Sequence, residues 1–380
     1  MKICAIICEY NPFHNGHLYG LREAKRRSGA DALLCIMSGN FVQRGESTIM
    51  DKYTRAKHAL QAGADVVIEL PTVFATANAE LFAKGAVSIL SAIPSVNTLC
   101  FGCENADKTA FKLAARYLNN EPKEVSEKIK EMTSSGMSYA KARASAWAGY
   151  IPLDLLCSPN NILGLEYTRA ILASNANIDI LPIQRVGNGY NEAELNEQLP
   201  SATAIRNAIK NGNKIENQVP KFVLQDLPTH PENLLETLEK HAILAMNKDA
   251  LARVCDCTEG LENAFKRAAE TPVSLAETLT SARYTTARIR RIALQALLGI
   301  EENLIKECLQ NSLYLKLLAI KKENTALLKN LASSDLPIVA RAHDEDKLNK
   351  TAKKCFEKDL YAEKIYKLLY PQTQKGVIFH

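Results

Sequence analysis

The chain has 380 residues, of which 47% are hydrophobic and 23% are charged, a balance that excludes a disordered protein and is typical of a globular one. This length favours two domains over one. The net charge of +5 permits RNA binding but is too small for a dedicated basic protein. The N-terminus lacks the long apolar region of a signal peptide, and no apolar stretch could span a bilayer, so we expect a cytoplasmic protein.

The first half of the chain alternates between strand-like and helix-like segments. The predicted strands are Ile3–Cys8, Ala32–Met37, Asp65–Leu70, Asn97–Phe101 and Ile178–Gln184. The predicted helices begin at Asn15 or cover Lys52–Ala62, Ala79–Ser91, Asn161–Ser174 and Thr203–Lys210. The pattern predicts an α/β fold with a Rossmann-like parallel sheet, in which ligands bind at the carboxyl ends of the strands.

The alternation is interrupted by Asp107–Leu118 and Glu124–Tyr150, which are mostly helical and could form an insertion that covers the site. The polar stretch Arg185–Pro200 indicates a mobile loop. Beyond Gly212 the predicted helices are Glu232–Met246, Thr258–Glu270, Ser274–Leu279, Thr285–Leu298 and Asn324–Ala332, with strands at Leu313–Ile320 and Pro337–Ala340. We expect a first domain over residues 1–212, which holds the sheet, and a mainly α-helical domain over residues 213–380.

A His-x-Gly-His motif, His14 to His17, follows the first strand and opens the first helix. Its histidines share one face of a helical turn that also presents unpaired backbone N–H groups and the positive end of the helix dipole. Gly16 lets a ligand approach the backbone closely. Isolated histidines at this spacing are often surface or metal-binding residues, but the strand before them and the helix after them favour a cradle for polyphosphate.

A second candidate phosphate motif is Ser201-Ala-Thr-Ala-Ile-Arg206, where a hydroxyl residue at a helix start is followed by Thr203 and Arg206. Alone it would indicate a capped helix with a surface arginine. Together with the upstream histidine motif, it predicts contacts to the outer phosphates of a nucleotide.

Several motifs occur in a fixed order: EYNPFHNGH, MSGNFVQRGE at Met37–Glu46, RAKHALQAGADVVIELP at Arg55–Pro71, FG at Phe101–Gly102, SPNNILGLEY at Ser158–Tyr167 and SATAIR. This set resembles the bacterial tRNA(Met) cytidine acetate ligase family, within the HIGH superfamily of nucleotidyltransferases. The resemblance covers most of the first 210 residues with several specific motifs and is weaker beyond them.

The resemblance implies that residues 1–212 form an ATP-binding nucleotidyltransferase-like catalytic domain. It implies that acetate attacks the α-phosphorus of ATP, giving acetyl-adenylate and pyrophosphate. The acetyl group then passes to N4 of the wobble cytidine of elongator tRNA(Met), forming N4-acetylcytidine. Mg²⁺ is expected with ATP, although no all-protein magnesium site is evident. No organic cofactor or obligate protein partner is predicted.

The predicted catalytic residues are His14, His17 and Arg206, which stabilise the charge of the leaving pyrophosphate. Family resemblance adds Gly102, Asn160 and Arg185 as ATP contacts. The full set of predicted ATP contacts is Ile7, Cys8, Glu9, Tyr10, Asn11, Pro12, Phe13, His14, Asn15, Gly16, His17, Leu18, Tyr19, Gly20, Gly102, Asn160, Arg185, Ser201, Thr203 and Arg206.

The loop Ser38–Glu46 leaves a strand at the edge of the site, so Gln43, Arg44 and Glu46 are candidate substrate contacts, although charged loops are often only solvated. Lys52, at the next helix start, is a candidate phosphate contact.

One segment is rich in arginine and predicts tRNA contacts through Arg283, Arg288, Arg290 and Arg291. The alternative is a solvated helix face or ion pairs within the domain.

The ten cysteines include Cys100 and Cys103 in a CxxC and Cys255 and Cys257 in a CxC, but a zinc site needs paired sets with suitable geometry, so we expect reduced thiols and no zinc.

Two other functions stay open. One is a metabolic adenylyltransferase that acts on a mononucleotide or phosphopantetheine; its usual chain is shorter. The other is a non-catalytic tRNA-binding protein with an inherited nucleotide pocket, which the intact motifs disfavour.

Overall fold

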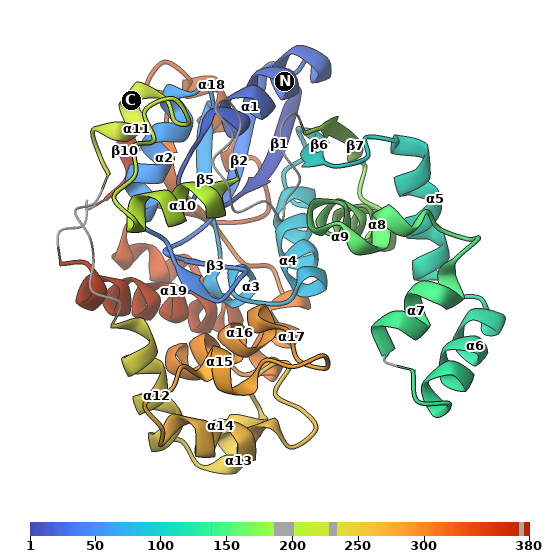
Figure 1. Cartoon of the computed structure of the whole chain (residues 1–380). Coiled ribbons are helices and arrows are strands. Elements are labelled where there is room, and N and C mark those ends of the chain that lie inside the picture. Colours follow the sequence, from blue (N-terminus) through green and yellow to red (C-terminus); the bar gives the residue numbers. More distant parts are fainter. Residues whose placement is uncertain (138, 186–200, 228–233, 372–375) are drawn as a thin grey trace.

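The computed structural model describes residues 1–137, 139–185, 201–227, 234–371 and 376–380, and Figure 1 shows a central sheet flanked by helices. The strand order in this sheet is β10-β8-β5-β2-β1-β6-β7. Strands β1 (Ile3–Cys8), β2 (Ala32–Ser38), β5 (Val66–Leu70), β6 (Val96–Cys103) and β7 (Asp179–Gln184) are mutually parallel. The predicted α/β class and parallel sheet are therefore confirmed.

Both faces of the sheet are buried, because successive side chains of each strand enter different hydrophobic cores. In β1, Ile3 and Ala5 join the core that α4 (Ala79–Ser91) and α9 (Pro159–Ala173) cover. Cys4 joins the opposite core, under α1 (Asn15–Ser28), α2 (Lys52–Gln61) and α10 (Ala202–Lys210). These helices lie within one or two residues of their predicted bounds. The short α3 (Thr72–Ala75) and the hairpin of β3 (Phe41–Val42) and β4 (Glu46–Ser47) were not predicted.

The insertion between β6 and α9 forms an arm of four helices that projects from one edge of the sheet in Figure 1. These are α5 (Lys108–Asn119), α6 (Lys123–Ser134), α7 (Tyr139–Trp147) and α8 (Leu153–Cys157). The prediction that the insertion is helical is confirmed. The suggestion that it covers the site is wrong for the described residues, because none of the arm lines the pocket described below.

A helical part follows residue 213, consisting of α11 (Lys221–Leu224), α12 (Leu235–Ala245), α13 (Lys248–Ala252), α14 (Leu261–Ala269), α15 (Leu275–Leu279), α16 (Thr286–Leu298) and α17 (Glu302–Leu309). Ile243, Phe265 and Ile292 belong to a separate hydrophobic core within it. Beyond it come β8 (Leu315–Ile320), α18 (Thr325–Ala332), β9 (Ile338–Val339), the 3-10 helix Ala342–Lys347, α19 (Lys350–Leu369) and β10 (Ile378–Phe379).

The last part of the chain completes the sheet of the first part. Strand β8 pairs antiparallel with β5, and β9 and β10 each pair with β8 in parallel. In Figure 1 the orange and red segments accordingly lie against the blue strands. The division at residues 212 and 213 stays a prediction. The strand pairing shows that residues on both sides of it share one sheet.

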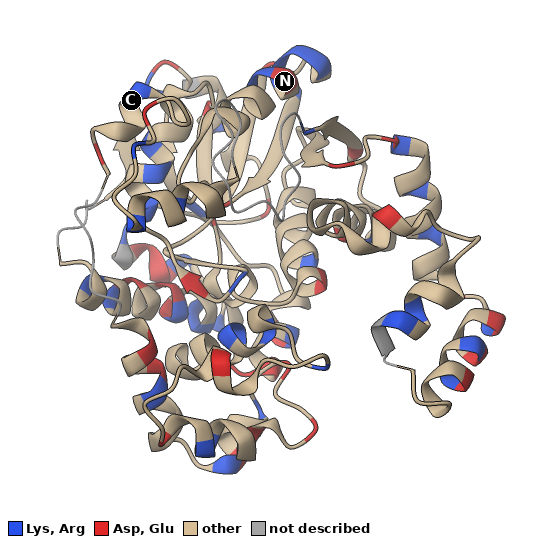
Figure 2. Cartoon of the chain, in the orientation of Figure 1, with Lys and Arg blue, Asp and Glu red and all other residues tan. Residues whose placement is uncertain are grey.

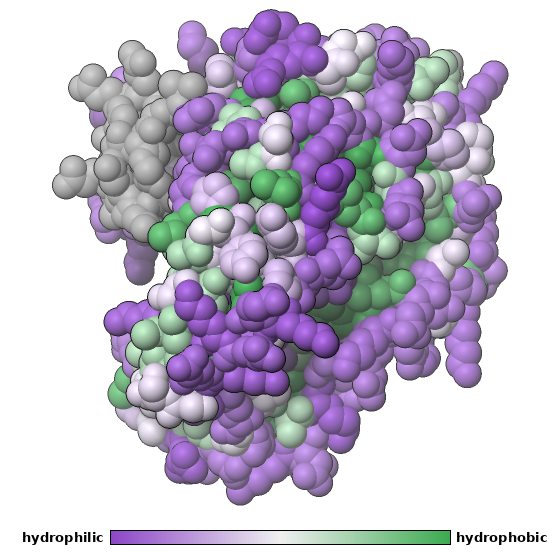
Figure 3. Space-filling model, turned by 90° about the vertical axis from the view of Figure 1, so that its right-hand side faces the viewer, coloured by the Kyte–Doolittle hydropathy of each residue, from purple (hydrophilic) through white to green (hydrophobic). Residues whose placement is uncertain are grey.

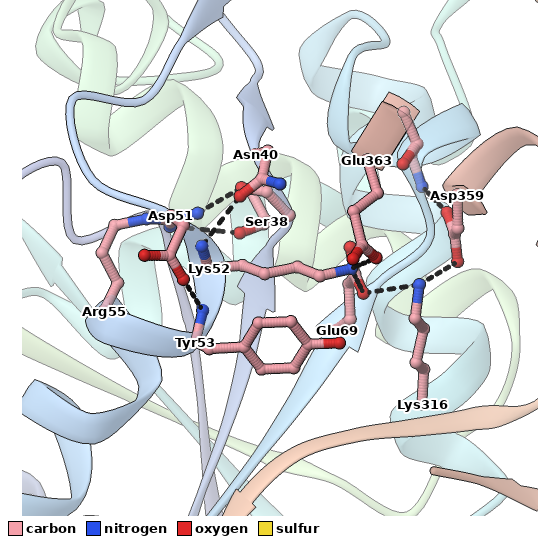
Figure 4. A network of polar contacts seen from close by, with 12 residues as sticks. Ser38, Asn40, Asp51, Lys52, Tyr53, Arg55, Glu69, Lys316, Asp359 and Glu363 are labelled. Carbon is pink, nitrogen blue, oxygen red and sulfur yellow. Dashed lines mark hydrogen bonds and ion pairs between the residues drawn. The ribbon is translucent and has the colours of Figure 1, made fainter. Parts of the chain in front are cut away.

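A cluster of buried charges joins this returning segment to the sheet (Figure 4). The ammonium of Lys52 lies 2.8 Å from a carboxylate oxygen of Glu69 and 3.2 Å from one of Glu363. Lys316 lies 2.9 Å from the same Glu69 oxygen and 3.6 Å from Asp359. These residues come from α2, β5, β8 and α19, so the cluster connects the two ends of the chain through charges that burial leaves little screened.

The surface is mostly hydrophilic on the face drawn in Figure 3, where hydrophobic side chains gather in a hollow. Among the described residues, no helix combines the length and apolar character that crossing a membrane would require.

Candidate functional site

A pocket with a volume of about 710 Å³ lies at the carboxyl ends of β1, β6 and β7. The helix starts of α1 and α10, parts of α4, α9 and α16, and the hairpin that follows β2 also contribute to its walls. Predicted site residues that line it are Ile7, Cys8, Glu9, Tyr10, Asn11, His14, Gly16, His17, Tyr19, Gly20, Gln43, Arg44, Glu46, Gly102, Asn160, Arg185, Ser201, Thr203, Arg206, Arg290 and Arg291. The motifs that lie far apart in the sequence therefore meet at one place.

The two motif histidines form the N-terminal cap of α1. The Nδ1 of His14 accepts a hydrogen bond from the backbone N–H of Gly16 at 3.1 Å, and the Nδ1 of His17 accepts one from the N–H of His14 at 3.3 Å. Their rings stack with centroids 3.6 Å apart. The cap explains why the helix begins here, because these side chains satisfy backbone donors of its first turn.

Both histidines are neutral at physiological pH. Burial, reinforced by the charges of Arg185 and Arg206, lowers the pKa of His14 from 6.5 to about 3. Burial, then His14 and Arg185, also hold the pKa of His17 well below its usual range. Because each Nδ1 accepts a hydrogen bond, each neutral ring carries its proton on Nε2. The pair can thus donate hydrogen bonds to phosphate oxygens.

The second phosphate motif lies beside the first. The hydroxyl of Ser201 caps α10 by accepting from the N–H of Ala204 at 3.1 Å. The guanidinium of Arg206 donates to the carbonyl of Asn11 at 2.8 Å and contacts the hydroxyl of Thr203 at 3.3 Å. Arg206 is therefore held against the loop that carries the histidines, where it can reach the same phosphates.

Glu104 connects the end of β6 to the start of α9 at one side of the pocket. The sequence analysis did not identify this residue. One oxygen of its carboxylate accepts from the side chain of Asn160 at 2.6 Å, and the other accepts from the N–H of Asn161 at 3.0 Å. The side chain of Asn161 in turn accepts from the N–H of Glu104 at 2.9 Å. This reciprocal arrangement orients Asn160. The available signal was an acidic residue just beyond a strand end.

An apolar wall lies beside Glu104, made of Phe82, Phe101 and Tyr167 together with Ile162 and Leu163. The rings of Phe101 and Tyr167 pack edge to face, with centroids 5.9 Å apart. Such a wall can hold a planar base. Gly102 lines the pocket on the side of Arg185, where a side-chain carbon would lie 3.5 Å from Arg185, an ordinary contact distance.

The hairpin of β3 and β4 ties the histidine loop to α16. The carboxylate of Glu9 accepts from the N–H of Gln43 at 2.9 Å, and the side chain of Asn11 accepts from the N–H of Ile49 at 2.9 Å. The buried guanidinium of Arg55 binds the carbonyls of Glu9 and Ser38, at the ends of β1 and β2. These contacts fix the hairpin, with Gln43, Arg44 and Glu46, against the pocket.

Some predicted residues lie elsewhere. Pro12, Phe13, Asn15 and Leu18 do not line the pocket; Phe13 is buried in a core, and the side chain of Asn15 donates to the carbonyl of Asn217. Lys52 points into the buried charge cluster (Figure 4), which does not support contact with phosphate. Residues 186–200, most of the predicted mobile loop, lie outside the described residues.

The basic segment is not a uniform surface, and Figure 2 shows acidic and basic residues interspersed over the helical part. Arg283 pairs with Glu259, Arg288 donates to the carbonyl of Asp256, and Arg291 is buried with its guanidinium 3.6 Å from the Asp256 carboxylate. Arg290 pairs with Glu46 in the pocket. Every one of these arginines has an intramolecular partner, as the alternative interpretation anticipated, and contact with tRNA stays a prediction.

The fold and the site define a nucleotidyltransferase, and comparison with known proteins agrees. A model of the HIGH nucleotidyl transferase family matches residues 1–377. The chain is 36% identical over 398 residues to the tRNA(Met) cytidine acetate ligase of Acetivibrio thermocellus, covering 97% of this chain and 95% of that protein. It is 37% identical over 390 residues to the enzyme of the same name from Thermoanaerobacter sp., covering 98% and 96%.

A solved structure is similar over the whole chain. The crystal structure of Thermotoga maritima TmcAL bound with alpha-thio ATP matches with a TM-score of 0.90 and 30% identity, covering 100% of this chain and 99% of that one. This chain belongs to the HIGH nucleotidyl transferase family and, within it, to the tRNA(Met) cytidine acetate ligases.

Proposed function

We propose that this protein is an ATP-dependent, AMP-forming ligase that acetylates elongator tRNA(Met). It activates acetate as acetyl-adenylate and transfers the acetyl group to N4 of the wobble cytidine, producing N4-acetylcytidine. The names of its relatives support the reaction, and the pocket described above supports the chemistry.

The observation that carries the proposal is the meeting of His14, His17 and Arg206 in one pocket. In the first step a carboxylate oxygen of acetate bonds to the α-phosphorus of ATP while the bond to the β-phosphate breaks. Negative charge therefore grows on the departing pyrophosphate. Two neutral N–H donors and a fixed guanidinium can stabilise that charge without moving a proton. In the second step the cytidine amine attacks the acetyl carbonyl, AMP leaves and the amine loses a proton.

The proposed nucleotide contacts are the lining residues of the histidine loop together with Gly102, Asn160, Arg185, Ser201, Thr203 and Arg206. The apolar wall of Phe82, Phe101 and Tyr167 offers a surface on which the adenine base can pack. Glu104 acts through Asn160 as a positioning residue.

We also propose that Mg²⁺ enters with the phosphates of ATP. Among the described lining residues, the carboxylates are Glu9 and Glu46, and both already accept hydrogen bonds from the protein. Mg²⁺ in nucleotide sites is commonly held by phosphates, water and few carboxylates, which fits this pocket. Because tRNA and ATP are the proposed substrates, the proposed location is the cytoplasm.

The test is incubation of the protein with ATP, isotope-labelled acetate and a tRNA(Met) transcript, followed by mass spectrometry of the nucleosides. Labelled N4-acetylcytidine at the wobble position is expected, with release of AMP and pyrophosphate. A matched transcript with uridine at that position should stay unmodified. Pyrophosphate release that needs a mononucleotide or phosphopantetheine and not acetate would replace the proposal with a metabolic adenylyltransferase. Absence of pyrophosphate release with either would favour a non-catalytic tRNA-binding protein.

A further inference from the structure

Three charged side chains from distant parts of the sequence meet in the pocket. Glu46 lies on β4, Arg206 on α10 and Arg290 on α16. One carboxylate oxygen of Glu46 lies 3.4 Å from the guanidinium of Arg206, and the other is hydrogen-bonded to the guanidinium of Arg290. A single carboxylate therefore sits between two guanidinium groups.

The backbone is built to hold Glu46 at this place. Gly45, just before it, has φ +72, a conformation that favours glycine. A side-chain carbon at Gly45 would lie 2.4 Å from the backbone carbon of Arg290 and 2.5 Å from the backbone nitrogen of Arg291. The hairpin tip thus rests directly on α16, and only glycine permits that approach. Backbone packing therefore brings Glu46 close to Arg290, although the two side chains stay partly open to solvent, at 27% and 44% exposed.

The surroundings of Glu46 favour an anion. Arg44 lines the pocket near Arg206 and Arg290 and adds positive charge there, whereas Arg185 adds charge on the side of Glu104 and His14. Paired guanidinium groups match the geometry of carboxylate and phosphate oxygens. In the free protein, Glu46 supplies such an oxyanion from the chain itself.

We propose that Arg206 and Arg290 together form an oxyanion subsite for the reaction, and that Glu46 occupies this subsite until a substrate anion displaces it. The inference rests on the proposed function and deepens it. Arg290 then belongs to the active site, although it lies beyond the predicted nucleotide domain and was predicted to contact tRNA. It also gives α16 a direct contact to the substrate.

Two parts of the reaction offer a suitable oxyanion. One is the outer phosphates of ATP, which leave as pyrophosphate; the other is the carboxylate of acetate. Both would place their oxygens between the same two guanidinium groups. Arg206 also touches Thr203 in the phosphate motif, which places the outer phosphates nearest to the pair.

The first experiment measures binding by calorimetry for Arg290→Gln. Binding of ATP and of pyrophosphate should weaken on the order of 10- to 100-fold, the usual loss for a charged hydrogen bond, while binding of AMP stays unchanged. Arg283→Gln is the matched control, because Arg283 belongs to the same basic segment, pairs with Glu259 and does not line the pocket. If Arg290→Gln instead raises only the KM for acetate, the bound oxyanion is the acetate carboxylate.

The second experiment uses Glu46→Gln, which keeps the size of the side chain and removes its charge. Because the substrate anion no longer has to displace a carboxylate, pyrophosphate should bind roughly fivefold more tightly or better. A residue that simply stabilised the fold or contacted the substrate amine would give unchanged or weaker pyrophosphate binding. Thermal unfolding of both variants, compared with the wild type, confirms that the altered affinities come from folded protein.

Normal use of ATP, pyrophosphate and acetate by Arg290→Gln would overturn the inference. Unchanged or weaker binding by Glu46→Gln of the anion that Arg290 is found to bind, pyrophosphate or acetate, would also overturn it. The proposed function fails separately. Wild-type protein that binds ATP but shows no acetate-dependent exchange of pyrophosphate into ATP would contradict the function. The calorimetric comparison with pyrophosphate would still decide whether the oxyanion subsite exists.

Discussion

Replacing Lys52 with methionine should destabilise the protein and leave its affinity for ATP unchanged. Lys52 is 1% exposed, and its ammonium contacts the carboxylates of Glu69 and Glu363. Methionine keeps most of the aliphatic length and removes the charge. The cluster then holds Glu69, Glu363 and Asp359 with Lys316 as the remaining central cation (Figure 4).

The expected cost is about 3 kcal/mol of unfolding free energy, at the lower end of the range for removing one partner of a buried ion pair. The lower end applies because Lys316 still lies 2.9 Å from Glu69. The loss of Lys52 should also weaken the ionisation of Glu363. Burial alone would raise the pKa of Glu363, but the charge of Lys52 and the hydrogen bond from Lys367 help to lower it to about 2.

Urea unfolding at neutral pH measures this cost, and calorimetry with ATP on the folded variant measures affinity. Lys57→Met is the matched control, since Lys57 lies on the same helix and pairs with Asp226 at 2.5 Å where both side chains are partly exposed, at 28% and 27%. A pair of that kind should contribute about 1 kcal/mol or less. If Lys52→Met kept its stability and lost affinity for ATP, Lys52 would belong to the phosphate site and the role of the cluster would be refuted.

Three further predictions concern the pocket. His14→Ala should slow acetyl-adenylate formation on the order of 10²- to 10³-fold, with a smaller change in ATP binding. Single-turnover kinetics measure this step, and a wild-type rate would contradict the role of His14 in stabilising the leaving pyrophosphate. Arg206→Ala should weaken binding of ATP more than that of AMP, and calorimetry showing an equal loss would remove Arg206 from the outer phosphates. Stability should fall as pH drops below 6.5, because the unfolded chain then binds a proton that buried His14, with its pKa lowered to about 3, does not. At pH 5 the loss of unfolding free energy from His14 amounts to about 2 kcal/mol. The urea midpoints of the wild type and of His14→Gln should therefore converge as pH falls. Midpoints that fall in parallel would disprove the lowered pKa of His14.

Local patterns were enough to predict the nucleotide-binding part of the fold. Strand β1 and helix α4 have the predicted bounds, because apolar β-branched runs and helix-period apolar residues are signals contained within one segment. The histidine motif could be placed for the same reason, since it lies between such a strand and such a helix. The parallel pairing of these strands follows from their alternation with helices, whereas their order in the sheet was not predicted.

Long-range pairing could not be predicted in the same way. The 20-residue helix α19 was missed, although Ala352, Cys355 and Phe356 follow a helical spacing. The buried face continues through Asp359, a charged residue that interrupts an apolar pattern in the sequence. Its partners are Lys316 and Tyr314, more than forty residues earlier in the chain. The same limit applies to Glu104, whose role depends on Asn160 in another element.

The basic segment of α16 shows why neighbouring charges in a sequence need not act as one surface. A helix turns by about 100° per residue, so Arg288 and Arg291 lie on one side of α16 and Arg290 points in a different direction. Arg288 and Arg291 anchor Asp256, whereas Arg290 reaches Glu46 in the pocket. Replacing all three would therefore combine a loss of stability with a change in the active site, and it would not isolate binding of tRNA. Because Gly45 holds the hairpin against α16, a tRNA that moved this helix would also move Glu46. A contact site for tRNA on the helical part would then be coupled to the proposed oxyanion subsite through this backbone packing. Replacing Arg290 alone tests the subsite and leaves the contacts of Arg288 and Arg291 with Asp256 in place.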